Sequence, residues 1–153
     1  MIMLNTRVRP AVNGDAAQMV TLLNTIIAAG NTTTQQATFD IAAMRAHYIS
    51  PPALICCHVA ISNGRLSGFQ FLGWDGAQDG QAIIASFISP VRAQMGIGQK
   101  LFAATRFAAK AACVKTIDAI IQADNIAELS YYHGLGFSDY GTPSDRIRKR
   151  FDL

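Results

Sequence analysis

Charged side chains are scarce in this chain of 153 residues, because only 15% of them are Asp, Glu, Lys or Arg. The acidic residues are nine Asp and a single Glu, Glu128. We therefore expect no active site built on paired carboxylates. Half of the residues are hydrophobic, which at this length is enough for one substantial core. We expect residues 1–153 to form a single domain without a linker.

Cysteine is also rare, and Cys56, Cys57 and Cys113 have spacings that fit neither a disulfide framework nor a zinc site. We expect all three to be small core residues, since a reactive thiol needs exposure and a basic neighbour. The longest apolar stretch, residues 53–61, contains His58 and is too short to cross a bilayer. The N-terminus shows no basic region followed by a long apolar run. These absences predict a cytoplasmic protein that does not enter a membrane.

Basic residues are dense in one place, where Arg146, Arg148, Lys149 and Arg150 alternate with apolar residues. The net charge of the chain is only +3. A solvated face of a strand is favoured over a nucleic-acid patch, and no nucleic-acid partner is expected.

The hydrophobic pattern changes period several times along the chain, which predicts a mixed α/β fold. Asn13 or Asp15 can cap the first helix, and Asn63-Gly64 is typical of a hairpin turn. Expected strands cover residues 7–10, 54–61, 66–74, 83–89, 116–123, 137–140 and 146–153, and expected helices cover about 15–29, 40–48, 98–112 and 125–133.

A glycine-containing loop connects the expected strand 83–89 to a long helix. The strand breaks at Pro90, and Gly96 and Gly98 stand where the helix begins. The first amides of a helix are unpaired and lie at the positive end of its dipole. Glycine removes the side chains that would keep a ligand from the backbone. This loop therefore predicts a site for a phosphorylated ligand.

Two familiar nucleotide sites fit the loop less well. A dinucleotide fingerprint would place a third glycine at Leu101, and its acidic residue, Asp118, would lie inside a strand rather than at its end. A P-loop would need Gly-Lys-Ser/Thr, which does not follow here.

A second block about thirty residues later makes the loop more specific. It reads Asn125-x6-Tyr132-x2-Leu135-Gly136-Phe137. Together the two blocks resemble the signature of the GNAT acetyltransferase superfamily, and the likeness extends over nearly the whole chain. In that family the loop begins with Gln or Arg, whereas Ala93 stands there, flanked by Arg92 and Gln94. The resemblance implies a single GNAT-like domain with a mixed, mostly antiparallel sheet of about six to seven strands and about four helices.

The resemblance also implies an activity, which is transfer of an acetyl group from acetyl-CoA to an amine by direct attack in a ternary complex, without a metal. Amides of the loop and helix start would hold the pyrophosphate, with charge from Arg92 or Lys100. Backbone groups at the end of a splayed strand would pair with the pantetheine arm, and Asn125 would add a side-chain bond. The implied cofactor-binding residues are Phe87, Ile88, Arg92, Gln94, Met95, Gly96, Ile97, Gly98, Gln99, Lys100 and Asn125.

Tyr132 corresponds to the family's general acid, which protonates the leaving thiolate. The base stays open among Asp75, His58 and a water held by Ser86. The threonine-rich segment 31–38 resembles the subgroup acting on amino acids and analogues such as phosphinothricin, and a homodimer is common in the family. Two alternatives remain: a non-catalytic module that binds acyl-CoA, and a protein N-acetyltransferase, although no acidic cluster that would dock a protein is visible.

Overall fold

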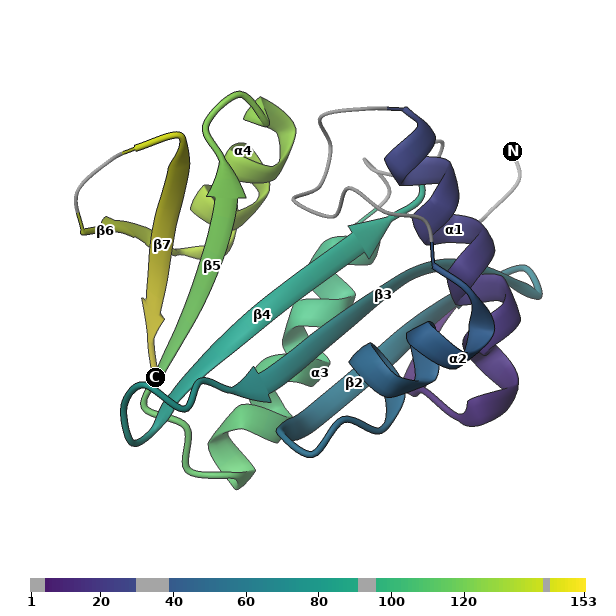
Figure 1. Cartoon of the computed structure of the whole chain (residues 1–153), viewed down its shortest axis with the longest axis horizontal. Coiled ribbons are helices and arrows are strands. Elements are labelled where there is room, and N and C mark those ends of the chain that lie inside the picture. Colours follow the sequence, from purple (N-terminus) through teal and green to yellow (C-terminus); the bar gives the residue numbers. More distant parts are fainter. Residues whose placement is uncertain (1–4, 30–38, 91–95, 142–143) are drawn as a thin grey trace.

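A seven-stranded sheet organises the computed structural model, which describes residues 5–29, 39–90, 96–141 and 144–153 (Figure 1). Its order is β1-β2-β3-β4-β5-β7-β6, and β4 and β5 are the one parallel pair among the described strands. The strands are β1 (Thr6–Pro10), β2 (Leu54–Ser62), β3 (Arg65–Trp74), β4 (Gln81–Ile88), β5 (Thr116–Gln122), β6 (Ser138–Tyr140) and β7 (Arg146–Asp152). This confirms the predicted single-domain mixed sheet.

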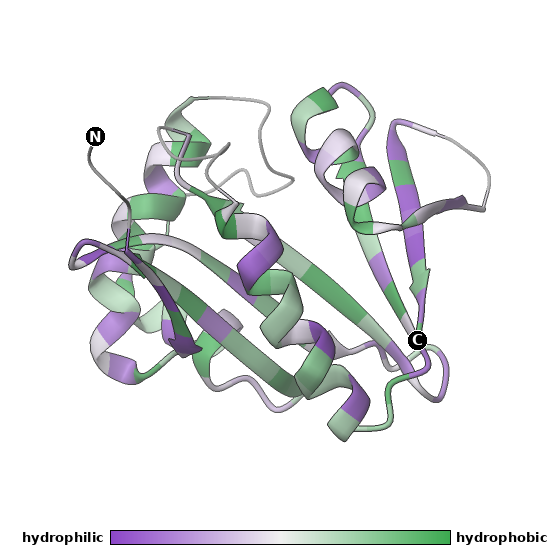
Figure 2. Ribbon diagram, turned by 180° about the vertical axis from the view of Figure 1, so that it is seen from behind, coloured by the Kyte–Doolittle hydropathy of each residue, from purple (hydrophilic) through white to green (hydrophobic). Residues whose placement is uncertain are grey.

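Helices cover both faces of the sheet (Figures 1 and 2). One face carries α1 (Ala16–Ala28), which follows a 3-10 turn (Asn13–Asp15), and α2 (Ile41–Met44). The opposite face carries α3 (Ile97–Ala111), while α4 (Ile126–Leu135) lies beside β5. The apolar stripe of α1 packs on β2 and β3, and Leu101 of α3 packs on Ala60 from behind.

Local chemistry explains several element boundaries. Asn63 and Gly64 both have positive φ, 51° and 80°, as the predicted tight hairpin between β2 and β3 requires. Asp40 caps α2 by accepting a 2.7 Å hydrogen bond from the Ala43 amide. The expected helix over 40–48 is α2 followed by a π turn, Arg45–Ile49. That turn carries Tyr48 over the sheet, where its ring centroid lies 5.5 Å from those of Phe71 and Phe87.

The structure contradicts two expectations, that the basic residues of β7 form a solvated face and that Cys113 lies in the core. The basic residues of β7 are not simply solvated, because Arg150 and Arg148 pair with the fully buried carboxylate of Asp118 at 2.7 and 3.4 Å. Lys149 is buried beside Asp139. Cys113 is exposed with a φ of 63°, since it follows the end of α3, whereas Cys57 is buried as expected. Within the described ranges, no helix is long and apolar enough to span a bilayer.

Candidate active site

The strands β4 and β5 separate along their length, which opens the sheet at its centre (Figure 1). They pair only from Gln81 to Ile83, although β4 pairs with β3 as far as Ile88. The Ser89 amide bonds to Ser67 on β3, and alternation then turns the backbone groups of Ser86 and Ile88 toward the open side. Ile88 therefore offers the free edge predicted for a peptide-like ligand. The backbone of Phe87 faces β3, and its side chain lines the opening.

The N-terminus of α3 lies beyond the end of β4, as the glycine loop predicts. Gly96 precedes the helix with a φ of 75°, and the first helical hydrogen bond runs from the Lys100 amide to the Gly96 carbonyl at 3.1 Å. The amides of Ile97, Gly98 and Gln99 consequently have no acceptor inside the helix. Gln99 and Lys100 are exposed. The remaining predicted contacts, Arg92, Gln94 and Met95, lie outside the described residues.

The two glycines have different roles. A Cβ on Gly96 would meet no atom within 4 Å, so this position is open to a ligand and glycine is favoured by its positive φ. A Cβ on Gly98 would lie 2.4 Å from Cε1 of Tyr131 and 2.8 Å from Cδ1 of Ile88. Gly98 therefore allows α4 to pack closely on α3, which differs from the ligand clearance expected from the sequence.

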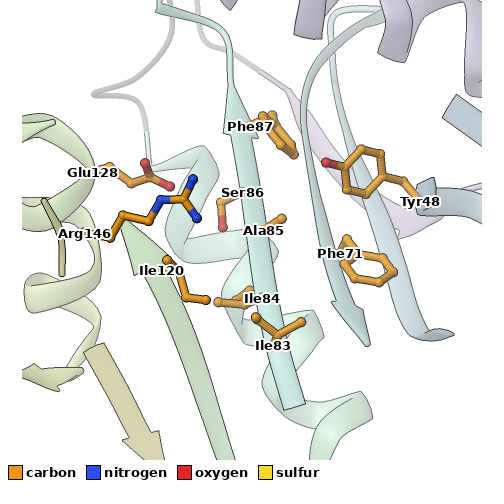
Figure 3. Close-up of a pocket in the computed structure, with 10 residues that line it drawn as sticks. All are labelled: Tyr48, Phe71, Ile83, Ile84, Ala85, Ser86, Phe87, Ile120, Glu128 and Arg146. Atoms are coloured by element: carbon orange, nitrogen blue, oxygen red, sulfur yellow. The ribbon is translucent and has the colours of Figure 1, made fainter. Parts of the chain in front are cut away.

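Two cavities occupy the opening and share Ser86, Phe87 and Glu128 as walls. The first, of about 300 Å³, also contacts Ile88, Asn125 and Tyr131, on the side of the loop before α3. The second, of about 230 Å³, also contacts Tyr48, Phe71 and Arg146 (Figure 3). The cavities therefore approach one another at Ser86 and Glu128, from opposite ends of the gap.

Tyr132 is enclosed beneath this junction. Its hydroxyl donates a 2.8 Å hydrogen bond to Ser86 Oγ, and its ring packs on Tyr131 and Phe137 at centroid distances of 4.9 and 5.1 Å. Burial, then the nearby Glu128, raises the pKa of Tyr132 well above its usual range. The phenol is protonated at neutral pH, as a donor must be. However, the residue is only 1% exposed, so Ser86 lies between its hydroxyl and the cavities.

Glu128 is a site residue that sequence reasoning missed. Asn125 caps α4 by accepting from the Glu128 amide at 3.2 Å, and its Nδ2 donates to Glu128 Oε2 at 2.9 Å. Burial raises the pKa of Glu128 to about 7. No ion pair to Glu128 forms among the described residues, and Arg146 faces it across the cavity (Figure 3). Its spacing of three residues after Asn125 was the available signal, since that places it one turn before Tyr132.

The bases considered from the sequence lie elsewhere. Asp75 is in the turn between β3 and β4 and accepts a hydrogen bond from Gln81, at the opposite end of β4 from Ile88. His58 is on β2, two strands from the opening, and burial lowers its pKa. Neither lines the two cavities, whereas Ser86, proposed to hold a water, lines both. His133, next to Tyr132 in the sequence, is exposed.

Asn125 is 5% exposed and lines the larger cavity, although it is already engaged with Glu128. One amide hydrogen and one oxygen lone pair remain for a ligand. No group of three His, Cys, Asp or Glu able to hold a metal occurs in the part of the chain that the structure describes.

Comparisons with solved structures agree on the fold. A GCN5-related N-acetyltransferase from Kribbella flavida superimposes with a TM-score of 0.84 at 17% identity, covering 97% of this chain and 98% of that one. A putative acetyltransferase from Salmonella typhimurium with its cofactor acetyl-CoA gives 0.77 at 20% identity, covering 97% and 94%. A phosphinothricin acetyltransferase from Sinorhizobium meliloti in complex with acetyl-CoA gives 0.82 at 16% identity, covering 97% and 88%.

The sequence comparisons define the family. No curated protein sequence matches the chain. The model of the acetyltransferase (GNAT) family matches residues 23–137, a range that includes the gap between β4 and β5, the start of α3 and all of α4. The chain is therefore a member of the GNAT family of acetyltransferases.

Proposed function

We propose that the protein transfers the acetyl group of acetyl-CoA to the amine of a small molecule, an amino acid or an analogue of one, by direct attack in a ternary complex. The observation that carries this proposal is the pair of cavities that share Ser86, Phe87 and Glu128. One cavity lies toward the anion-binding start of α3, and the other opens on the far side. Two ligands entering from opposite ends would place their reactive groups at the junction.

The larger cavity suits the donor. The amides of Ile97, Gly98 and Gln99, which have no acceptor inside the helix, would hold the pyrophosphate, with charge from Lys100 and, on the basis of the sequence, Arg92. The free edge of β4 at Ile88 and Ser86 would pair with the amides of the pantetheine arm as an added strand. Asn125 would contact the same arm. The acetyl-CoA complexes of the Salmonella and Sinorhizobium proteins support this choice of ligand.

The smaller cavity suits an amino-acid acceptor because its walls include one acidic and one basic side chain, which match the ammonium and the carboxylate of an amino acid. Glu128 forms no ion pair with the described residues and can hold an ammonium and accept its proton, and its pKa of about 7 suits a base working near neutral pH. Arg146 can bind a carboxylate. The rings of Tyr48 and Phe71 line the wall of the cavity and would contact an apolar side chain. The Sinorhizobium phosphinothricin acetyltransferase supports this class of acceptor by analogy of fold.

Direct attack is consistent with the protonation of Cys56 and Cys57. Burial raises the pKa of Cys56 to about 11 and that of Cys57 to about 12. Neither is a thiolate at neutral pH, so neither is poised to form an acetylated intermediate. Tyr132 then assists departure of the thiolate from behind Ser86. Tyr132→Phe should lower turnover by up to about 100-fold, the lower end of general-acid contributions, and leave acetyl-CoA affinity nearly unchanged.

A substrate panel tests the proposal. Amino acids, their analogues, simple amines and peptides with free N-termini are incubated with acetyl-CoA, and free thiol and acetylated product are measured together. The expected result is acceptor-dependent thiol release that is strongest for a free amino acid. Strongest activity on peptide N-termini would support protein acetylation instead. Binding of acetyl-CoA without turnover on any acceptor would support a non-catalytic module.

The proposal includes a homodimer, which is common in the family. Its support here is limited to exposed apolar side chains such as Phe107, 79% exposed, and Ile126, 69% exposed. Light scattering at working concentration is expected to give twice the chain mass of 16.5 kDa. A mass of one chain would contradict this part.

A further inference from the structure

The hydrogen bonds around Ser86 have fixed directions. Thr105 Oγ1 donates to Gln70 Oε1 at 2.5 Å, which sets the orientation of the Gln70 amide. Gln70 Nε2 then donates to Ser86 Oγ at 2.8 Å and to the Tyr131 hydroxyl at 2.9 Å. The Tyr131 hydroxyl in turn donates to the Gly98 carbonyl at 2.8 Å. Every group in this network therefore has an assigned role as donor or acceptor.

Ser86 Oγ receives two of these bonds. Gln70 Nε2 and the Tyr132 hydroxyl both donate to it at 2.8 Å, and a hydroxyl oxygen has two lone pairs. The Ser86 hydroxyl hydrogen therefore remains available for donation to a third group. The Tyr131 oxygen is one acceptor close to it, because Gln70 Nε2 contacts both Ser86 Oγ and the Tyr131 oxygen. Hydrogen bonds from Gln70 and Ser86 accordingly lower a Tyr131 pKa that burial raises to about 12. A ligand group in either cavity would be a second possible acceptor of the Ser86 hydrogen, since Ser86 lines both cavities.

We propose that Ser86 is a catalytic residue that donates its hydroxyl hydrogen bond to the sulfur of the donor thioester, and that Tyr132 acts through Ser86 as a positioning residue. This rests on the proposed acetyl transfer. Gln70 and Tyr132 occupy both lone pairs of Ser86 Oγ, which leaves its hydrogen for Tyr131 or for a ligand in the cavities and makes the hydroxyl a stronger donor. Tyr132 itself is too enclosed to touch the sulfur without a rearrangement of α4.

The electron balance favours a hydrogen bond over full transfer of the Tyr132 proton. The amine nitrogen forms a bond to the thioester carbon, and the carbon–sulfur bond breaks with its electron pair left on sulfur. An ordinary thiol has a pKa of about 8.5, below that of a buried tyrosine, so moving the phenol proton to sulfur would be uphill. Ser86 stabilises the thiolate as it leaves, and the thiolate takes a proton from solvent. The amine nitrogen loses two protons in all, the first from its ammonium to Glu128 or water and the second after attack to water.

The direct test is the pKa of the thiol of bound coenzyme A, followed by thiolate absorbance against pH and corrected with desulfo-coenzyme A. In the wild type Ser86 lowers this pKa. We expect Ser86→Ala to raise it by about one unit, because a hydrogen bond to a charged group is lost, and Ser86→Thr to keep it low. Glu128, Arg146, Tyr48 and Tyr131 also face the cavities, and they are unchanged in every variant.

The position of Tyr132 is tested by combining variants. Tyr132→Phe should raise the thiol pKa by less than Ser86→Ala does, and the double variant should equal Ser86→Ala alone. Turnover should follow the same order, falling at least 100-fold in Ser86→Ala and recovering in Ser86→Thr. Additive effects, or a thiol pKa that is the same in Ser86→Ala and wild type, would overturn the proposal.

The readout separates this inference from the proposed function. If coenzyme A binds and acetyl transfer occurs with a thiol pKa independent of Ser86, only the role of Ser86 is wrong. If coenzyme A does not bind the wild type at all, the acetyltransferase proposal itself fails. A retained thermal shift with acetyl-CoA shows that each variant is folded and competent to bind.

Discussion

Gly96 allows a matched pair of variants that probes the anion site with little else changed. Gly96→Asp and Gly96→Asn have the same shape and impose the same strain at a φ of 75°, which costs about 1 kcal/mol in stability. A Cβ at this position meets no atom of the described residues within 4 Å. The two variants differ in charge alone, so a comparison between them isolates the electrostatics of the site.

The expected difference follows from Coulomb's law. A carboxylate about 6 Å from one phosphate charge costs roughly 3 kcal/mol at an effective dielectric constant of about 20. The affinity of Gly96→Asp for acetyl-CoA should therefore be about 100-fold weaker than that of Gly96→Asn. Titration calorimetry measures both constants, and the thermal shift gives a second measure, since ligand at about 100 times its dissociation constant stabilises by about 2.7 kcal/mol. Equal affinities in the two variants would place the pyrophosphate elsewhere.

Three further predictions concern stability. Burial raises the pKa of Glu128 to about 7 in the folded chain, above the ordinary value of 4.5, so the stability it contributes is present below pH 4.5 and is lost as the pH rises to 7. Glu128→Gln should remove this pH-dependent loss, which is up to about 3 kcal/mol. Urea unfolding at pH 5 and 8 measures it, and the same loss of stability between the two pH values in wild type and variant would contradict the prediction. Asp118→Asn should cost about 3 kcal/mol or more because it leaves Arg150 partly unpaired, whereas the exposed Asp124→Asn should change little; equal effects would refute this account. Gly98→Ala should destabilise by about 1 to 3 kcal/mol by displacing Tyr131, with Gly14→Ala as the control in open space, and an unchanged melting temperature would show that α4 yields without cost.

The order of elements could be predicted from the sequence because each boundary has a local cause. Asn63-Gly64, Pro51 and the apolar period of α1 each act within a few residues. The start of α3 was predictable for the same reason. The loop thus predicted where a helix N-terminus lies, whereas Gly98 is required by packing against Tyr131, a residue 33 positions away.

Contacts between residues far apart in the chain could not be predicted from the sequence. Arg148 and Arg150 alternate along β7 like a solvated face, yet they neutralise Asp118, because β5 and β7 are neighbours in the sheet. In the sequence Glu128 stands out only as the single glutamate of the chain. Its place at the junction depends on how far β4 and β5 diverge, which is a property of the whole sheet. Tyr132 was singled out by its spacing from Asn125 and Phe137, but its hydrogen bond to Ser86 depends on the fold and could not be predicted.

The most direct measurement of the central claim is a single-turnover experiment with stoichiometric acetyl-CoA, followed by intact-protein mass spectrometry and product analysis. Without an acceptor, the protein mass should stay unchanged and acetyl-CoA should remain intact. On addition of the best acceptor from the panel, acetylated product and free thiol should appear together at equal rates. An acetylated protein that forms without acceptor and then passes its acetyl group to the amine would contradict direct transfer at the junction of the two cavities.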